Sequence, residues 1–248
     1  MQQLTIITGA SSGIGAALAT QAAAAGHTVA TVSRRPGPGE HLAADLADPA
    51  SWDEMADWMD DLIARNPWDR VVFIHNAATL EPVGFAGEVD HAGYTANVLL
   101  NAASPSVLGN RFIAAAEAAG VPAQLQIISS GAGKRPIVGW ASYCAAKAAV
   151  DMWVRTAGLE RVERNSQVTI LSVGPGVVDT AMQAKIREQG TDAFPDVEQF
   201  RELKESGALR SPDEVAELLL LIGDANAGDI VAGTALTNGA VIDVSLFD

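Results

Sequence analysis

The chain is poor in cysteine, in aromatic residues and in positive charge. Its 248 residues include one cysteine, Cys144, which excludes an intrachain disulfide and a cysteine-based zinc site. Aromatic residues make up 5% of the sequence, but apolar residues as a whole make up 48%, enough to bury a sizeable core. At this length we expect one α/β domain that spans residues 1–248.

Basic residues are outnumbered. Sixteen Lys and Arg stand against thirty Asp and Glu, a formal charge of −14, and such a surface repels nucleic-acid backbones and anionic lipid. No apolar run approaches the roughly 20 residues that cross a bilayer, and the N-terminus lacks the pattern of a secretory signal. The four histidines have no metal-ligand spacing. We therefore expect a cytoplasmic protein without a metal site that binds neither nucleic acid nor membrane.

Short β-branched runs alternate with Ala-rich segments of helical period. Near-continuous apolar strands between helices predict a doubly wound (Rossmann), largely parallel sheet of about seven strands with helices on both faces. Pro105 should kink its helix locally. Strands are predicted at 3–8, 28–33, 70–75, 123–129, 167–173 and 240–244, and helices at about 13–25, 50–65, 91–119, 140–164 and 211–223.

Two segments interrupt the alternation. Residues 34–40 are rich in Pro and Gly, so the second crossover is expected to be abbreviated. Residues 181–208 are long, charged and weakly periodic. Because ligands bind beyond the carboxyl ends of parallel strands, we expect this insertion to be a lid or substrate loop. A solvated helical pair without ligand contact is the alternative.

A glycine-rich turn follows the first predicted strand. In Thr8–Gly15, Gly9 allows a tight turn, Gly13 allows backbone amides to approach a pyrophosphate, and Gly15 allows the next helix to pack closely on the sheet. The helix N-terminus then offers unpaired N–H groups to the anion. The order strand, turn, helix predicts a dinucleotide site, against the alternative of a merely tight turn.

The second predicted strand ends in Ser33, Arg34 and Arg35. A site that prefers the unphosphorylated ribose usually has Asp or Glu here. A hydroxyl and two guanidinium forks suit a 2′-phosphate instead, so the pattern favours NADP(H) over NAD. The alternative is that both arginines are simply solvated.

Tyr143 and Lys147 lie four residues apart on a predicted helix and therefore share one face. A free phenol has a pKa near 10, and a neighbouring ammonium should lower it toward the range useful for proton transfer. Ser130, thirteen residues before Tyr143 and just past a predicted strand, can donate to the same carbonyl oxygen. With the glycine turn, this spacing predicts a proton-transfer site beside the nucleotide.

On these motifs the chain resembles the short-chain dehydrogenase/reductase family over nearly its whole length. The resemblance implies that the catalytic residues are Asn97, Ser130, Tyr143 and Lys147, with Asn97 ordering a water that links Lys147 to solvent. The residues that it places around the cofactor are Gly9, Ser11, Ser12, Gly13, Ile14, Gly15, Ser33, Arg34, Arg35, Asp45, Leu46, Asn76, Ala77, Tyr143, Lys147, Pro175, Gly176, Val178 and Thr180.

Within the family, residues 139–147, 175–183 and 238–243 look like the branch that holds sepiapterin and benzil reductases. In that branch a C-terminal Asp reaches the substrate, and Asp243 matches its position; an ordinary strand-end acid is the alternative. Trp140 could form a wall for a flat substrate. The expected substrate residues are thus Ser130, Trp140, Tyr143 and Asp243. Two residues depart from the family pattern, Ala78 beside the ribose and Ser12 where many NADP-preferring members have Arg.

The expected function is an NADPH-dependent carbonyl reductase of ketones or vicinal diketones, in which Tyr143 is the proton donor. An NAD-dependent secondary alcohol dehydrogenase and a non-catalytic dinucleotide-sensing protein on the same fold remain alternatives. Members of the family are usually dimers or tetramers, so a homodimer or homotetramer is expected, with helices such as 91–119 and 140–164 at the interface.

Overall fold

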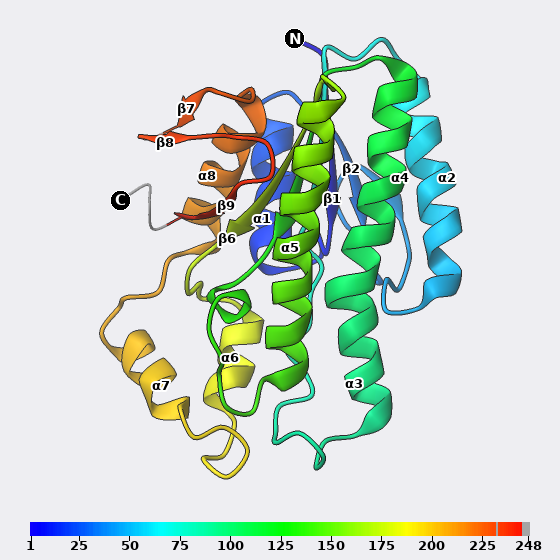
Figure 1. Cartoon of the computed structure of the whole chain (residues 1–248). Coiled ribbons are helices and arrows are strands. Elements are labelled where there is room, and N and C mark those ends of the chain that lie inside the picture. The colour runs from blue at the N-terminus through cyan, green and yellow to red at the C-terminus, as the bar shows by residue number, and fades with distance from the viewer. Residues whose placement is uncertain (232, 245–248) are drawn as a thin grey trace.

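Seven parallel strands form the centre of the molecule (Figure 1). The computed structural model describes residues 1–231 and 233–244. In spatial order the strands are β3 (Glu40–Leu42), β2 (Thr28–Val32), β1 (Gln3–Thr8), β4 (Arg70–His75), β5 (Ala123–Ile128), β6 (Val168–Gly174) and β9 (Val241–Asp243). The predicted doubly wound parallel sheet is confirmed.

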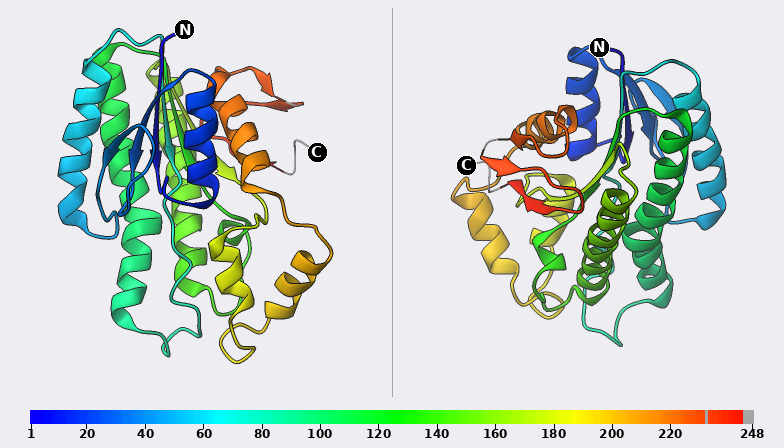
Figure 2. Two further views of the ribbon diagram at one scale, coloured as in Figure 1. Left: turned by 180° about the vertical axis from the view of Figure 1, so that it is seen from behind. Right: turned by 45° about the horizontal axis from the view of Figure 1, so that its top comes forward.

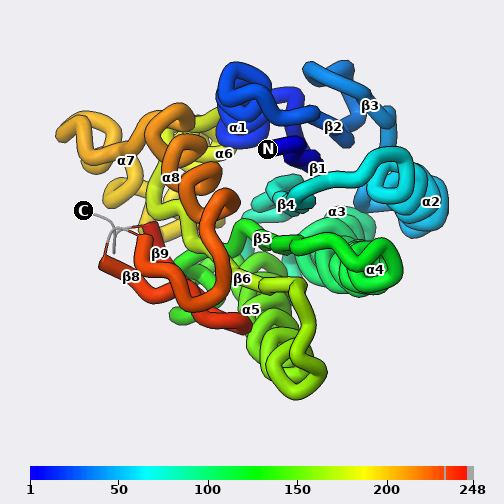
Figure 3. The backbone as a smooth tube through the Cα atoms, turned by 90° about the horizontal axis from the view of Figure 1, so that it is seen from above, coloured from blue at the N-terminus to red at the C-terminus, as the bar shows by residue number. Residues whose placement is uncertain are grey.

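Helices cover both faces of the sheet (Figure 3). One face carries α1 (Gly13–Ala24) and α8 (Pro212–Asp224), and the other carries α2 (Trp52–Ala64), α4 (Ser104–Ala119) and α5 (Ala141–Glu163). Apolar side chains of the buried strands alternate between the two resulting cores; Ile6 points to the α2, α4 and α5 side, and Ile7 to the α1 and α8 side. Both cores are largely aliphatic, as the composition requires.

The abbreviated second crossover is confirmed, but it contains a strand that the sequence pattern did not predict. Residues 34–39 form no helix, and β3 pairs with β2 in the register Ala30 to Glu40. Gly39 has a φ of 76°, and a Cβ there would lie 2.2 Å from the carbonyl oxygen of Val29. The crossover is therefore tight enough to need glycine.

The predicted helix 91–119 is not continuous. It consists of α3 (His91–Val98), a π-helical turn (Leu99–Ala103) and α4. In the π turn the N–H of Ser104 donates to the carbonyl of Leu99, five residues earlier. Pro105 has no N–H to donate to the carbonyl of Asn101, so an α-helical bond is impossible here. The interruption lies where the proline predicted a kink.

The strand order reverses between β1 and β4, so a crevice opens beyond their carboxyl ends. At this end of the molecule, opposite the N-terminus, lie α6 (Ala181–Arg187) and α7 (Val197–Glu205), as Figure 2 shows. The remaining elements are the 3₁₀ turns Pro49–Ser51 and Gly131–Gly133 and the hairpin strands β7 (Ile230–Val231) and β8 (Thr234–Ala235). Within the described residues, no helix has the length and apolar character to cross a membrane.

Candidate active site

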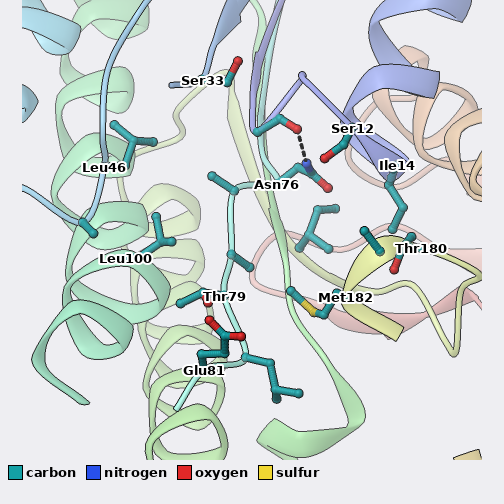
Figure 4. Close-up of a pocket in the computed structure, with 18 of the residues that line it drawn as sticks. Ser12, Ile14, Ser33, Leu46, Asn76, Thr79, Glu81, Leu100, Thr180 and Met182 are labelled. Atoms are coloured by element: carbon teal, nitrogen blue, oxygen red, sulfur yellow. Dashed lines mark hydrogen bonds between the residues drawn. The ribbon is translucent and has the colours of Figure 1, made fainter. Parts of the chain in front are cut away.

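A cleft of about 600 Å³ opens at the carboxyl ends of β1 and β4 (Figure 4). Most residues that the sequence predicts around a cofactor line it, whereas Gly15, Gly176 and Val178 do not. Those that do are Gly9, Ser11, Ser12, Gly13, Ile14, Ser33, Arg34, Arg35, Asp45, Leu46, Asn76, Ala77, Tyr143, Lys147, Pro175 and Thr180. The fold thus brings segments far apart in the sequence to one cavity.

The glycine turn needs glycine for two physical reasons. Gly9 and Gly13 have positive φ values of 69° and 54°, which other residues adopt at a cost. A Cβ on Gly15 would lie 2.4 Å from the carbonyl oxygen of Gly9, so Gly15 allows close packing without facing the cleft. The Ser12 side chain makes no capping bond to α1, which leaves the first amides of the helix directed to the cleft.

Asn76 and Thr8 brace this turn against the end of β4. The hydroxyl of Thr8 accepts hydrogen bonds from the backbone N–H groups of Asn76 and Ala77, both at 3.0 Å. The Asn76 side chain donates back to the carbonyl of Thr8 at 3.0 Å. Figure 4 shows Asn76 directly below the turn. These bonds position the floor of the cleft.

The predicted phosphate-binding residues gather beyond β2. The guanidinium of Arg34 is 76% exposed and lies 3.7 Å from a carboxylate oxygen of Asp45. Arg35 donates to the hydroxyl of Ser11 at 3.4 Å, and Ser33 donates to the carbonyl of Arg35 at 2.7 Å. Sequence reasoning missed that Asp45 gives Arg34 a competing anionic neighbour.

Tyr143 and Lys147 lie one turn apart on α5 and are both buried. The Nζ of Lys147 donates to the carbonyl of Ile128 at 2.7 Å and lies 5.6 Å from the centre of the Tyr143 ring. Burial raises the pKa of Tyr143 to about 12, although a hydrogen bond from Ser130 opposes this. Burial also lowers the pKa of Lys147 to about 8, and the charge of Asp151 opposes that shift.

The expectation that the pKa of Tyr143 lies below that of a free phenol is therefore wrong for the chain by itself. The loss of hydration on burial disfavours the phenolate more than its polar neighbours favour it. The phenol consequently keeps its proton at neutral pH. A protonated phenol is the form that can donate a proton, while oxidation of an alcohol needs the phenolate as base.

Ser130 stands at the end of β5 and begins the turn that leads to α5. Its Oγ accepts the backbone N–H of Ala132 at 3.2 Å, and its hydroxyl hydrogen bonds to Tyr143. Ser130 does not line the cleft, but its neighbour Ser129 does. The Ser129 hydroxyl is buried and has no hydrogen-bond partner among the described residues.

Asn97 is not directed into the cleft. Its amide donates to the carbonyls of residues 79, 80 and 81 at 2.8–3.3 Å, and its buried Oδ1 has no partner within the described part of the chain. Asn101, which sequence reasoning missed, lies in the π turn and bonds both backbone groups of Thr79. The sequence signal that could have indicated Asn101 is its position four residues before Pro105, where the helix is interrupted. Both side chains hold a loop that lines the cleft.

Two predicted substrate residues lie outside the cleft lining. Trp140 is buried, stacks on Phe194 with ring centres 5.0 Å apart, and meets the ring of Tyr143 edge-on at 5.9 Å. Asp243 pairs with Gly174 across β9 and β6, at the carboxyl end of the sheet. Contact of either residue with substrate stays a prediction.

The first part of the predicted lid borders the cleft, through Met182, Lys185 and Gln189. Lys185 also forms an ion pair at 3.1 Å with Glu81, which lies in the loop after β4. The second helix of the insertion, α7, packs on the aromatic cluster of Trp140 instead of lining the cleft. Neither Glu81 nor Lys185 carried a motif that could have marked it.

Comparisons with known proteins agree with this geometry. The model of the short chain dehydrogenase family matches residues 3–191. The chain is 35% identical to a benzil reductase ((S)-benzoin forming) of Bacillus subtilis, with 99% of each chain covered. It is 31% identical to the sepiapterin reductase of Bos taurus over 68% of this chain and 62% of that one.

Solved structures show the same fold. The KRED1-Pglu enzyme superposes with a TM-score of 0.81 at 25% identity, covering 97% of this chain and all of its own. A short-chain dehydrogenase/reductase of Saccharomyces cerevisiae has a TM-score of 0.78 at 23% identity, covering 98% and 96% of the two chains. The chain therefore belongs to the short-chain dehydrogenase family, in the branch of the benzil and sepiapterin reductases, and is an oxidoreductase.

Proposed function

We propose that this chain is a cytoplasmic, NADPH-dependent carbonyl reductase that acts on a ketone or vicinal diketone with an aromatic body. The observation that carries the proposal is that Tyr143 and Lys147 line the same cleft as the glycine turn. The Tyr143 phenol is protonated at neutral pH, the form that a proton donor needs. Benzil reductases that match nearly the whole chain support the substrate class.

The residues present fit a nicotinamide dinucleotide. At the glycine turn, a Cβ on Gly9 would lie 2.9 Å from the Cα of Ala77, so only a glycine leaves room for close backbone approach. The first amides of α1 suit a pyrophosphate, and Arg34 and Arg35 suit a 2′-phosphate. When bound, the reduced nicotinamide supplies the hydride; every other step falls to the chain itself.

Each polar residue has a separate task. Tyr143 donates its proton to the oxygen of the reacting carbonyl, and Ser130 donates a hydrogen bond to the same oxygen as its negative charge develops. The ammonium of Lys147 holds the ribose and stabilises the phenolate that forms when Tyr143 has donated its proton. Asn97 and Asn101 position the loop after β4, and we retain the water-ordering role expected of Asn97.

The substrate end of the cleft has apolar walls. Leu80, Val83 and Met182 line it, and the Glu81–Lys185 ion pair stands at its rim. Apolar walls with few polar groups suit an aryl body whose reacting carbonyl accepts hydrogen bonds from Ser130 and Tyr143. Trp140 and Asp243 remain candidate substrate residues.

The proposed function is tested by following NADPH oxidation with a panel of carbonyl compounds. We expect benzil, aryl ketones and sepiapterin to be reduced and simple aliphatic ketones to react more slowly, with each product resolved on a chiral column. Binding of NADPH without turnover on any member of the panel would contradict an enzyme and favour a dinucleotide sensor.

Arg34→Ala should weaken the binding of NADPH more than the binding of NADH. Loss of a charge-assisted bond of roughly 1.5–3 kcal/mol corresponds to an increase of about 10- to 100-fold in the Kd of NADPH. The Kd of NADH should change by less than about threefold, since NADH has no 2′-phosphate. Fluorescence titration of both nucleotides measures this.

Arg155→Ala is the matched control, because Arg155 is an exposed arginine on α5 outside the cleft. It should leave both Kd values unchanged. Tighter binding of NADH than NADPH by the unaltered chain would instead support an NAD-dependent alcohol dehydrogenase.

Exposed apolar side chains on α4 and α5 support the proposed homodimer or homotetramer. Val107 on α4 and Met152, Leu159 and Val162 on α5 are 42–67% exposed. Scattered exposed apolar residues are common, but these four lie on the two long helices that flank one face. Sedimentation analysis measures the state directly.

A further inference from the structure

Asp151 is a buried carboxylate that the proposed mechanism does not use. It lies on α5, four residues after Lys147, and both side chains are 3% exposed. Its Oδ1 accepts the hydroxyl of Ser172 on β6 at 2.6 Å. Its Oδ2 is buried and has no hydrogen-bond partner among the described residues. A buried carboxylate with one oxygen unpaired is costly unless a cation compensates it.

The geometry points the carboxylate at the helical turn of Lys147. Helical side chains lean toward the N-terminus, so Asp151 lies over the turn that contains Lys147. Gly133 of the turn after Ser130 packs there: a Cβ on Gly133 would be 2.8 Å from Oδ2 of Asp151 and 3.0 Å from the carbonyl carbon of Lys147. The absence of a side chain at Gly133 gives the carboxylate its place.

Other titratable groups do not supply the compensating charge. His75 at the end of β4 interacts with Lys147, but burial first and Lys147 second lower its pKa to about 3, so it is neutral at physiological pH. The Ser104 hydroxyl hydrogen bonds to the His75 ring at 3.0 Å. On the other elements packed against α5, the titratable residues are Lys134 after the Gly131–Gly133 turn, His91 and Tyr94 on α3, Arg111 and Glu117 on α4, and Asp243 on β9. Arg111 pairs with Asp57 and Asp60, and Glu117 pairs with Arg161.

We propose that Asp151 is a positioning residue that keeps Lys147 protonated in its buried place behind Tyr143. The inference rests on the role given to Lys147 under the proposed function. Burial alone would favour the neutral amine, and the carboxylate one turn away restores the ammonium. Ser172, by donating to Oδ1, holds the carboxylate in this orientation. The pair thereby sets the upper pH limit at which Lys147 can act.

The test is the titration of Lys147 in the nucleotide-free protein. The chain has only four lysines, so NMR of ¹⁵N-labelled or ¹³C-labelled lysine resolves them, and Lys147→Met assigns the signal. In Asp151→Asn the titration midpoint of Lys147 should fall by about one pH unit or more, as expected for loss of an opposite charge one helical turn away. The pH above which ketone reduction declines should move down by the same amount. At pH 6, kcat should stay within about threefold of that of the unaltered chain.

Three further variants make the result specific. Asp151→Glu should restore most of the shift. Ser172→Ala should move the midpoint in the same direction but by less. Thermal unfolding shows whether Asp151→Asn folds; if it does not, Ser172→Ala tests the proposal in its place. Glu160→Gln removes an exposed carboxylate from the same helix and should move nothing.

An unmoved Lys147 midpoint in folded Asp151→Asn would overturn the proposal. Because the NMR titration needs no turnover, it gives this answer even if no ketone is reduced. Failure of the proposed function and failure of the role of Asp151 are therefore distinguishable.

Discussion

Tyr143→Phe is expected to lower kcat for ketone reduction by about 10²- to 10⁴-fold, the usual contribution of a general acid. The change removes one hydroxyl and keeps the ring, which packs edge-on against Trp140. The Kd of NADPH should stay within about threefold, because the glycine turn and the arginines are untouched. Steady-state kinetics and nucleotide titration on the same preparation separate the two effects.

The chain offers a matched control, because its other tyrosine is Tyr94 on α3. Tyr94 does not line the cleft, so Tyr94→Phe should leave kcat unchanged. If Tyr143→Phe kept the kcat of the unaltered chain, the proton donor would have to be another group.

Lys147→Met should be nearly as damaging, with kcat/KM lower by roughly 10²-fold or more. Methionine keeps the length and volume of the side chain but removes the ammonium near the Tyr143 ring. It also leaves the carbonyl of Ile128 without its donor. Unlike the Tyr143 variant, this one should weaken NADPH binding as well, because Lys147 is assigned to hold the ribose.

The same residue predicts the pH profile of the unaltered chain. Since burial lowers the pKa of Lys147 to about 8 in the nucleotide-free chain, kcat/KM for NADPH should be level below that pH and fall above it as the ammonium loses its proton. Lys134→Met, at an exposed lysine outside the cleft, should change neither kcat nor the profile. A profile that stays level to pH 10 would show that the charge of Lys147 is not needed.

Local patterns were sufficient for much of the fold and for part of the site. The strand that ends at Thr8 and the helix that begins at Gly13 follow from a buried β-branched run, a glycine turn and an Ala-rich segment. The shared face of Tyr143 and Lys147 follows from their spacing. In each case the signal lies within a few neighbouring residues, so no distant contact was needed to find it.

The misses have a different origin. The three residues of β3 are too few to show a period, and their pairing depends on the edge that β2 presents. The sequence analysis named Asn97 and did not mention Asn101, because the π-helical turn that contains Asn101 is visible only in the structure. Trp140 does not line the cleft, because Phe194 and Phe200, more than fifty residues later, bury it in their own cluster. Its contact with substrate stays a prediction.

Short-range spacing and composition were enough to predict the parallel sheet, its glycine turn and the shared helix face of Tyr143 and Lys147, because strand period, helical period and backbone sterics act over a few residues. The direction of the Tyr143 pKa, the paired asparagines on the loop after β4 and the burial of Asp151 behind Lys147 emerged only from the folded chain. Those properties depend on desolvation and on charges brought together from distant segments, and neither quantity exists until the core has formed.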